Sequence, residues 1–207
     1  MTSEAYEKFR YAFFDDPYSA RDYLDVDTLR GLEDEDRKKA EQALLDFLPD
    51  LRAVIGLGLL RSQCAQSAIR AMFAAPAPLQ CRSRDVEIAK ALYLIAPAKE
   101  YVLYLCDVLR GSRDWLTRME AALALAETPD AAAISALEAA LDDRDHLVRH
   151  HAARALLKLH GLPADSNEPE DALYRIMSED AFRREGGKRD VLAAIAGREM
   201  TRSSEGG

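Results

Sequence analysis

The sequence predicts an all-α protein, a right-handed α-solenoid of about four stacked helix pairs that is closed at both ends by helical caps. Three observations support this prediction: a chain of 207 residues that is 48% hydrophobic, an aromatic content of only 7%, and a repeat of 31–33 residues. The hydrophobic content excludes a disordered tail and a disulfide-stapled miniprotein. The low aromatic content and the lack of alternating β-branched residues argue against a β-sandwich.

The repeat is clearest where two segments align at a shift of 31 residues. Asp114–Leu125 and Asp145–Leu156 share Asp, Leu, Arg, Ala-Ala and Ala-Leu at matching positions. The small residue of the last step recurs along the chain as Gly58, Ala91, Ala124 and Ala155. Because a small residue lets neighbouring helix backbones approach closely, this spacing predicts four similar units.

Each unit is expected to contain an outer and an inner helix. The units are expected at residues 35–61, 63–96, 98–127 and 129–160. The outer helices are expected over 35–48, 63–74, 98–110 and 130–142, and the inner ones over 50–61, 84–96, 114–127 and 145–160. Asp114 and Asp145 are placed to cap the free amides of the last two inner helices.

The two ends of the chain are expected to cover the apolar ends of the repeat array. Residues 1–34 are expected to form an N-terminal helical cap, because five aromatic residues fall within an expected helix over 3–14. Residues 161–200 are expected to form a C-terminal cap, with a polar break over 164–169 and helices at about 169–182 and 188–198. Residues 201–207 are expected to be frayed.

The segment Leu147–Leu157 and its copy around Arg118 resemble the HEAT repeats, particularly the short phycobilisome-lyase-like type. The resemblance covers the four expected units. It implies a structural ladder of hydrogen bonds between neighbouring repeats, in which an aspartate six residues before an arginine joins it. Asp143 and Arg149 match that pattern, and Arg118 is the corresponding arginine of the previous unit.

The inner helices carry a second stripe of residues on the side opposite their apolar packing face. In the solenoid that the resemblance implies, this stripe lines the concave surface, and its apolar members indicate a site for a partner. The stripe consists of Lys90, Tyr93, Trp115, Met119, Leu123, His146, His150 and Arg154, and the first unit has Ala53, Leu57 and Leu60 at the matching sites. Two alternatives stay open. Trp115 and Met119 belong to the core if the helix is rotated by one position, or terminal segments of the same chain fill the groove.

The sequence contains no recognisable catalytic constellation, and no cofactor is expected. His146 and His150 have a spacing that can chelate a metal, but no His-Glu motif accompanies them. Solvated histidines are therefore favoured, and no metal is expected. The three cysteines Cys64, Cys81 and Cys106 are widely spaced, which predicts reduced thiols.

The favoured function is a non-catalytic scaffold or adaptor that binds another protein on the concave face. The net charge of −8 favours a basic partner and argues against nucleic acid. The longest apolar run, residues 53–60, is too short to span a membrane, and the start of the chain lacks an apolar signal stretch, so a cytoplasmic protein of bacterial type is expected. Two alternatives come from the resemblance: an accessory subunit of a bilin-type chromophore lyase and, less favoured, a HEAT-like DNA-binding or base-excision protein.

Overall fold

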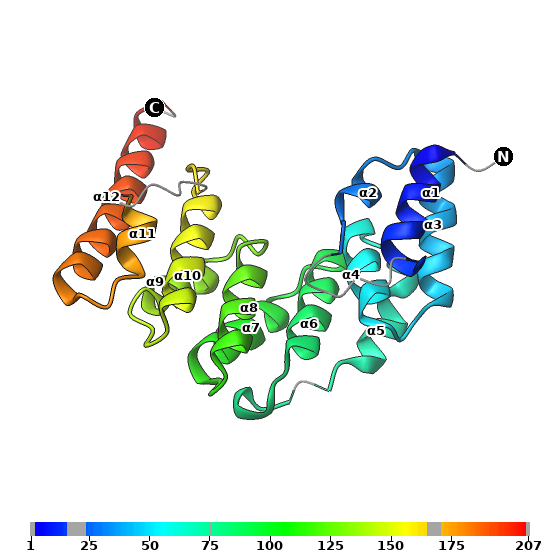
Figure 1. Ribbon diagram of the computed structural model, residues 1–207, viewed down its shortest axis with the longest axis horizontal. Coiled ribbons are helices and arrows are strands. Elements are labelled where there is room, and N and C mark those ends of the chain that lie inside the picture. Colours follow the sequence, from blue (N-terminus) through cyan, green and yellow to red (C-terminus); the bar gives the residue numbers. More distant parts are fainter. Residues whose placement is uncertain (1–2, 16–23, 75, 165–170, 206–207) are drawn as a thin grey trace. The chain divides into compact units, whose positions relative to one another are not determined.

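The fold is helical throughout the part of the chain that is described. A computed structural model describes residues 3–15, 24–74, 76–164 and 171–205 (Figure 1). Over these residues the regular structure consists of helices and contains no strand, so the predicted all-α solenoid class is confirmed. The chain divides into two compact units: residues 1–75 with 87–101, and residues 76–86 with 102–207.

The first unit is built from the N-terminal helices. Its elements are α1 (Glu4–Arg10), a π-helical turn (Tyr11–Asp15), α2 (Asp27–Arg30), α3 (Asp34–Asp46), α4 (Leu51–Leu60), a 3-10 turn (Gln63–Ala65), α5 (Gln66–Met72) and most of α6 (Ser83–Ile95). The outer helix expected over 35–48 and the inner helix expected over 50–61 correspond to α3 and α4. The expected N-terminal helix is α1 with its π-helical turn; residues 16–23 of the expected cap lie outside the described residues.

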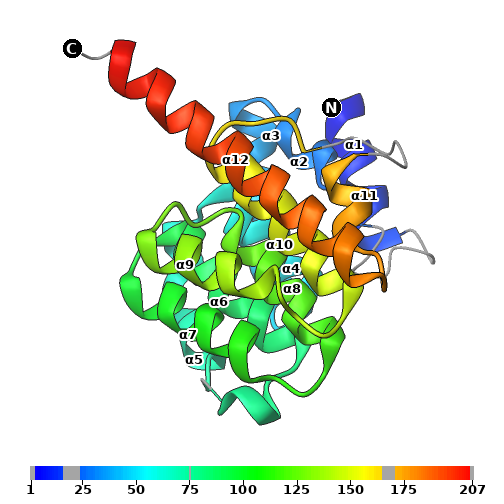
Figure 2. The same cartoon turned by 90° about the vertical axis from the view of Figure 1, so that its left-hand side faces the viewer.

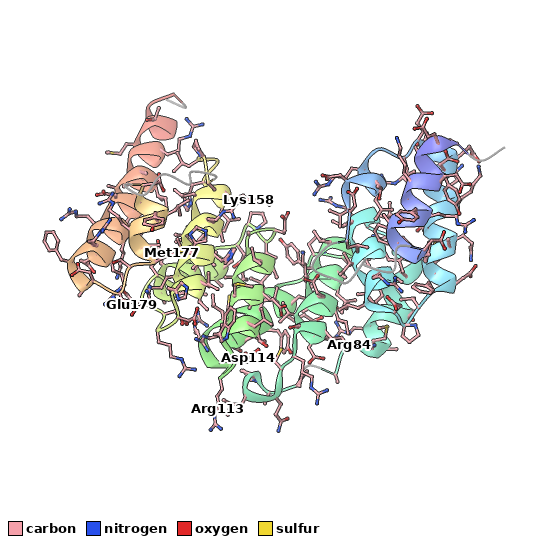
Figure 3. The ribbon with its side chains drawn as sticks, viewed as in Figure 1. Arg84, Arg113, Asp114, Lys158, Met177 and Glu179 are labelled. Atoms are coloured by element: carbon pink, nitrogen blue, oxygen red, sulfur yellow. The ribbon has the colours of Figure 1, made fainter. Side chains whose placement is uncertain are left out.

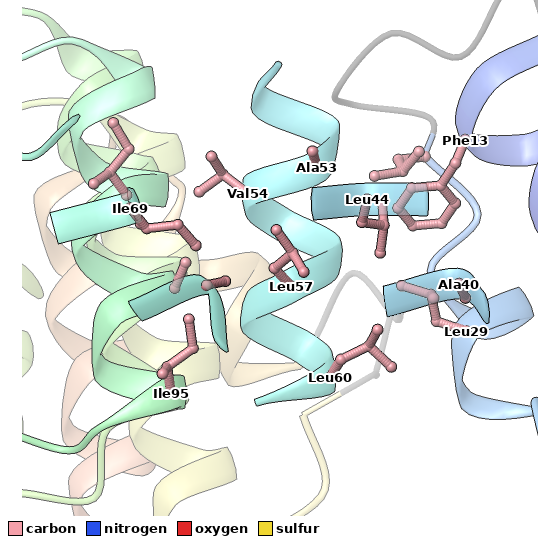
Figure 4. Packing of buried hydrophobic residues seen from close by; sticks show 14 of the residues in the cluster. Phe13, Leu29, Ala40, Leu44, Ala53, Val54, Leu57, Leu60, Ile69 and Ile95 are labelled. Carbon is pink, nitrogen blue, oxygen red and sulfur yellow. The ribbon is translucent and has the colours of Figure 1, made fainter. Parts of the chain in front are cut away.

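Helix α4 lies at the centre of the first unit's core (Figure 4). Its Val54 and Leu57 are fully buried, and Leu44 of α3 and Phe13 of the π-helical turn pack in the same cluster. A Cβ placed on Gly58 would lie 2.9 Å from both Cα and Cβ of Ala91. Helices α4 and α6 therefore touch through two of the small residues that mark the repeat, which explains why one of them is glycine.

The second unit contains the helices with the clearest repeat. Its elements are a 3-10 turn (Pro78–Gln80), α7 (Lys99–Gly111, from residue 102), α8 (Trp115–Leu125), α9 (Ala131–Ala140), α10 (His146–Leu159), α11 (Ala172–Ile176) and α12 (Ala181–Glu205). Helix α10 packs against α8 and α9, and α12 lies along α11 (Figure 2). Helices α8 and α10 correspond to the inner helices expected over 114–127 and 145–160.

The C-terminal helices differ from the sequence expectation. The break between them falls at residues 177–180, so helices over 169–182 and 188–198 are not found, and Gly186 and Gly187 lie inside α12. A Cβ on Gly187 would lie 2.7 Å from the carbonyl oxygen of Ala172, so this glycine lets α12 rest on the backbone of α11. Helix α12 continues to Glu205, into the expected frayed tail, and residues 206 and 207 lie outside the described residues. The polar break expected over 164–169 lies outside the described residues from 165 onward.

Candidate functional site

Helices α8 and α10 lie side by side in a register of one repeat. Arg144 Nη2 donates a hydrogen bond of 2.9 Å to the carbonyl oxygen of Arg113, at the start of the two helices. Lys158 of α10 forms an ion pair with Glu127, which follows α8. Each pair joins equivalent positions of consecutive repeats, so the 31-residue shift read from the sequence is also the contact register of the two helices.

An aspartate caps the N-terminus of each inner helix of the second unit. The Asp114 carboxylate accepts a hydrogen bond from the Thr117 amide at 3.1 Å, and hydrogen bonding from the Thr117 side chain lowers the pKa of this carboxyl. The Asp145 carboxylate accepts from the Leu147 amide at 2.9 Å. Asp180 repeats the arrangement at the start of α12, where its carboxylate accepts from a backbone amide. All three satisfy amides that the helix itself leaves unpaired.

An arginine stands four residues after each capping aspartate. Its side chain donates hydrogen bonds to main-chain carbonyls of the loop that precedes its own helix. Arg118 Nη1 donates to two carbonyl oxygens six and five residues earlier, at 3.0 and 3.1 Å. Arg149 Nη1 makes the same two contacts at 2.9 and 3.2 Å. Arg184 Nη1 makes them at 3.3 Å each. The three arginines therefore have the same local geometry, and the α11–α12 pair has the same design as the two repeats before it.

The remaining donors of these arginines reach the next repeat. Arg118 Nε and Nη2 donate to the two carboxylate oxygens of Asp143, at 2.8 Å each. Arg149 Nε donates to the carbonyl oxygen of Ile176 at 2.9 Å, and its Nη2 reaches the carbonyls of Met177 and Ser178. These contacts form a ladder that connects α8, α10 and the loop between α11 and α12.

The ladder differs in one detail from what the resemblance implies. The Asp143 carboxylate binds Arg118 of the preceding repeat, whereas Arg149 contacts only the main-chain carbonyl of Asp143. Sequence reasoning missed Arg184 because the C-terminal region was interpreted as a cap. The signal was available: Asp180 and Arg184 have the same four-residue separation as Asp114 and Arg118.

The comparison with protein families agrees with this extent of the repeat. The HEAT repeats family matches residues 86–185, which ends just after Arg184. The match supports a HEAT-repeat protein and is to the general repeat, without singling out the phycobilisome-lyase-like type. The search of curated proteins and the search of solved structures found no match. None of the described helices is both long enough and apolar enough to cross a membrane.

Helix α8 presents three apolar residues of the expected stripe at intervals of four. Trp115 is 41% exposed and Leu123 is 42% exposed, while Met119 between them is half-buried. Each of the three side chains is therefore covered by protein on one side and is open to solvent on the other. Since residues four apart lie above one another on a helix, these side chains form a continuous apolar strip on the surface of the second unit.

The histidine part of the stripe is more covered than expected. His146, which begins α10 at the position equivalent to Trp115, is exposed. His150 is half-buried, its Nδ1 lies 3.3 Å from the Leu173 carbonyl oxygen of α11, and burial lowers its pKa. Arg154 is also half-buried, and its Nε donates to the Ala164 carbonyl at 2.9 Å. His150 and Arg154, which the sequence predicts to contact a partner, are therefore bonded within the chain, to α11 and to the segment that follows α10.

The expected stripe positions of the first unit are largely part of its core. Ala53, Leu57 and Leu60 are buried, because α4 packs against neighbours on both of its sides. Tyr93 is half-buried and packs against the same cluster, and Lys90 is half-buried beside Glu87. The described residues of the first unit thus offer little of the predicted partner surface.

A hollow of about 380 Å³ lies beside His146, and sequence reasoning missed most of its lining. The lining residues are His146, Tyr174, Arg175, Met177, Ser178 and Arg183. Tyr174 is 47% exposed and Arg175 is held by Asp190 at 2.6 Å. An exposed aromatic ring next to a thioether and two guanidinium groups suits a protein partner, because interface anchors are rich in these groups.

The described residues offer no arrangement that suggests catalysis. Among them, no group of three His, Cys, Asp or Glu side chains is placed to hold a metal ion. The Cys81 thiol accepts a hydrogen bond of 3.2 Å from Tyr104, and burial raises the pKa of both groups. Burial also raises the pKa of Cys106 to about 11. Thiols with raised pKa values are poor nucleophiles at neutral pH.

Proposed function

We propose that this chain is a non-catalytic protein-binding module and that it holds its partner on the exposed face of the second unit. We define the exposed face as Trp115, Met119 and Leu123 of α8, His146 of α10, and the hollow beside His146. The observation that carries the proposal is the pair Trp115 and Leu123, which remain more than two-fifths exposed on one face of a helix.

The composition of the exposed face supports this proposal. Large apolar side chains that stay in water cost free energy, and contiguous ones usually mark interaction sites. Tryptophan, tyrosine, methionine and arginine are enriched among the residues that dominate binding energy, and the exposed face contains each of them. HEAT repeats commonly bind other proteins, so the match over residues 86–185 fits the same role.

The charge of the chain adds a long-range preference. The net charge of −8 favours encounter with a basic partner, since complementary charge mainly raises the association rate. Contact specificity then depends on the local groups of the exposed face rather than on the total charge.

The experiment compares two double variants in quantitative capture from native lysate. Trp115→Ala with Leu123→Ala removes the apolar strip. Leu79→Ala with Leu103→Ala is the matched control, because these leucines are 60% and 43% exposed but lie outside the exposed face. A partner that uses the exposed face is depleted by the first variant and retained by the control; equal recovery with both would contradict the proposal.

Trp115 also allows a direct measurement on the purified complex. It is the single tryptophan of the chain, so its emission reports this one position. We expect a blue shift and reduced acrylamide quenching when the captured partner is added, because binding removes the indole from water. Unchanged emission at saturating partner would place the contact elsewhere.

A further inference from the structure

A second hollow, of about 370 Å³, lies where the loops before α8 and α10 meet. Its lining is unusually rich in arginine and consists of Arg110, Gly111, Ser112, Arg113, Arg118, Asp143 and Arg144. We call this set the arginine hollow. It is separate from the exposed face, although Arg113 is only two residues before Trp115 in the chain.

The hydrogen-bond acceptors of the arginine hollow are already occupied. The carbonyl oxygens of Ser112 and Arg113 accept from Arg118 Nη1, and that of Arg113 also accepts from Arg144. Both carboxylate oxygens of Asp143 accept from Arg118, and one of them also accepts from the Asp145 amide. The Arg118–Asp143 pair is therefore neutral and satisfied, and it adds no free acceptor.

The donors are in excess. Arg144 uses one nitrogen, Nη2, and Arg113 has no side-chain partner among the described residues. Arg110 is half-exposed, and its closest carboxylate, Asp107, is 3.6 Å away, which is beyond a good hydrogen bond. Figure 3 shows Arg113 extending from the loop before α8, and this residue is exposed.

Apart from Asp143, the nearby carboxylates are not part of the lining of the hollow. Asp114 is turned to its own helix, where it accepts from the amide and the hydroxyl of Thr117. Asp107 offsets one charge at a distance. The residues that line the hollow include four arginines and one aspartate, so the lining itself is positive on a chain whose total charge is −8. A local reversal of sign at a concave site favours an anion there.

We propose that the arginine hollow binds a phosphate group. A dianionic phosphate matches the site because its oxygens accept several hydrogen bonds at once, and the planar guanidinium presents paired donors with the same spacing. Arg110, Arg113 and Arg144, which line the hollow, would supply these donors. A single carboxylate would leave most of the donors unused.

The phosphate has two possible sources, and both use the same chemistry. It is either a phosphorylated side chain of a protein partner or a free phosphate or pyrophosphate ion. The first source would place a phosphorylated residue close to the start of the exposed face. The inference does not depend on the proposed function, because phosphate binding is measurable in the absence of any partner.

The test is a titration of the full chain at about 0.15 M salt, where long-range charge effects are screened. Binding is monitored by the NMR chemical shifts of the backbone amides and by calorimetry. The probes are inorganic phosphate, pyrophosphate, a phosphoserine peptide and the same peptide with serine. We expect shifts at the amides of residues 111–114 and 143–145 with a phosphate-bearing probe and none with the serine peptide. Stronger binding of the phosphopeptide identifies a protein source, and equal or stronger binding of pyrophosphate identifies a free anion.

Variants test whether the arginine hollow is the site. Arg113→Ala with Arg144→Ala is expected to weaken binding at least about tenfold, which corresponds to about 1.4 kcal/mol. Arg189→Ala is the control, because it removes an exposed positive charge elsewhere in the second unit and is expected to leave binding unchanged. The proposal is overturned if no probe produces shifts at these amides, if sodium chloride of equal ionic strength produces the same shifts, or if the control weakens binding as much as the double variant. None of these results would affect the Trp115 and Leu123 experiment.

Discussion

The guanidinium of Arg118 donates two hydrogen bonds of 2.8 Å to the carboxylate of Asp143. The Arg118 side chain is only 3% exposed and that of Asp143 is 12% exposed. This buried pair joins the start of α8 to the loop that precedes α10. In the next repeat the same position of the loop is Ser178, and Arg149 binds main-chain carbonyls there instead. An arginine is thus the donor at both steps of the ladder, whereas the acceptor is a carboxylate at one step and main-chain carbonyls at the next.

The Arg118–Asp143 pair is expected to be important for stability. Asp143→Ala leaves a buried guanidinium without its counter-charge, and we expect a loss of about 3 kcal/mol in the free energy of unfolding. Urea denaturation followed by circular dichroism measures it. Lys158→Ala, which breaks an exposed ion pair with Glu127, is the control and is expected to cost at most about 1 kcal/mol. Similar small losses for both variants would show that the ladder pair contributes little.

Two glycines of α12 are expected to respond in opposite ways to alanine. Gly187→Ala places a Cβ 2.7 Å from backbone atoms of α11, and we expect a loss of about 1–3 kcal/mol from the forced separation of the helices. A Cβ on Gly197 meets nothing within 4 Å. Gly197→Ala is therefore expected to add about 0.5–1 kcal/mol, because alanine loses less backbone entropy in a helix. Thermal unfolding of both variants checks the signs, and a stabilising Gly187→Ala would mean that α11 and α12 pack differently.

The three cysteines are expected to differ in reactivity. Cys64 is exposed, whereas Cys81 and Cys106 are buried and burial raises the pKa of both thiols. A thiol reagent such as DTNB is therefore expected to modify one thiol per native chain quickly and the other two only after denaturation. Cys64→Ser should abolish the fast phase. A fast phase of two or three thiols in the native protein would contradict the burial of Cys81 and Cys106.

His151 is expected to make the fold sensitive to mild acid. Burial, together with the nearby His150 and Arg154, lowers the pKa of His151 from 6.5 to about 4. Above pH 6.5 the imidazole is neutral in both folded and unfolded chains. As the pH falls from 6.5 toward 4, only the unfolded chain gains the proton, so the folded state loses stability over this window.

Comparison with His151→Gln isolates this contribution. The difference in free energy of unfolding between the native sequence and the variant should decrease as the pH is lowered from 7 to 4.5. Denaturant titrations at a series of pH values measure this difference. A difference that stays constant across the window would mean that His151 titrates alike in the folded and unfolded chains.

The repeat could be predicted from the sequence because its signals are local. The Asp-x-x-x-Arg spacing, the small residues at Gly58 and Ala91, and the capping position of Asp145 each depend on residues close together in the chain. The last repeat was missed because its first helix, α11, is short and Gly187 lies within the second. A glycine in a helix usually signals an end, and only the contact with α11 shows why it stands there.

The candidate site was less predictable, for a physical reason. A helical period identifies which residues share a side, but exposure depends on what packs against that side. Leu123 and Leu57 occupy matching stripe positions, yet Leu123 is 42% exposed and Leu57 is fully buried. His150 was expected beside them and is instead covered by α11.

The sequence by itself determined the helical class, the repeat length and the equivalent positions of Arg118 and Arg149, because these follow from short-range spacing. Tertiary structure decided which acceptor each arginine binds, which stripe residues remain in water, and that Arg110, Arg113 and Arg144 border one hollow. Residues as far apart in the chain as Arg118 and Asp143, which are separated by 25 positions, meet only when the helix pairs stack. Burial and charge at the site are therefore properties of the packed units rather than of any segment alone.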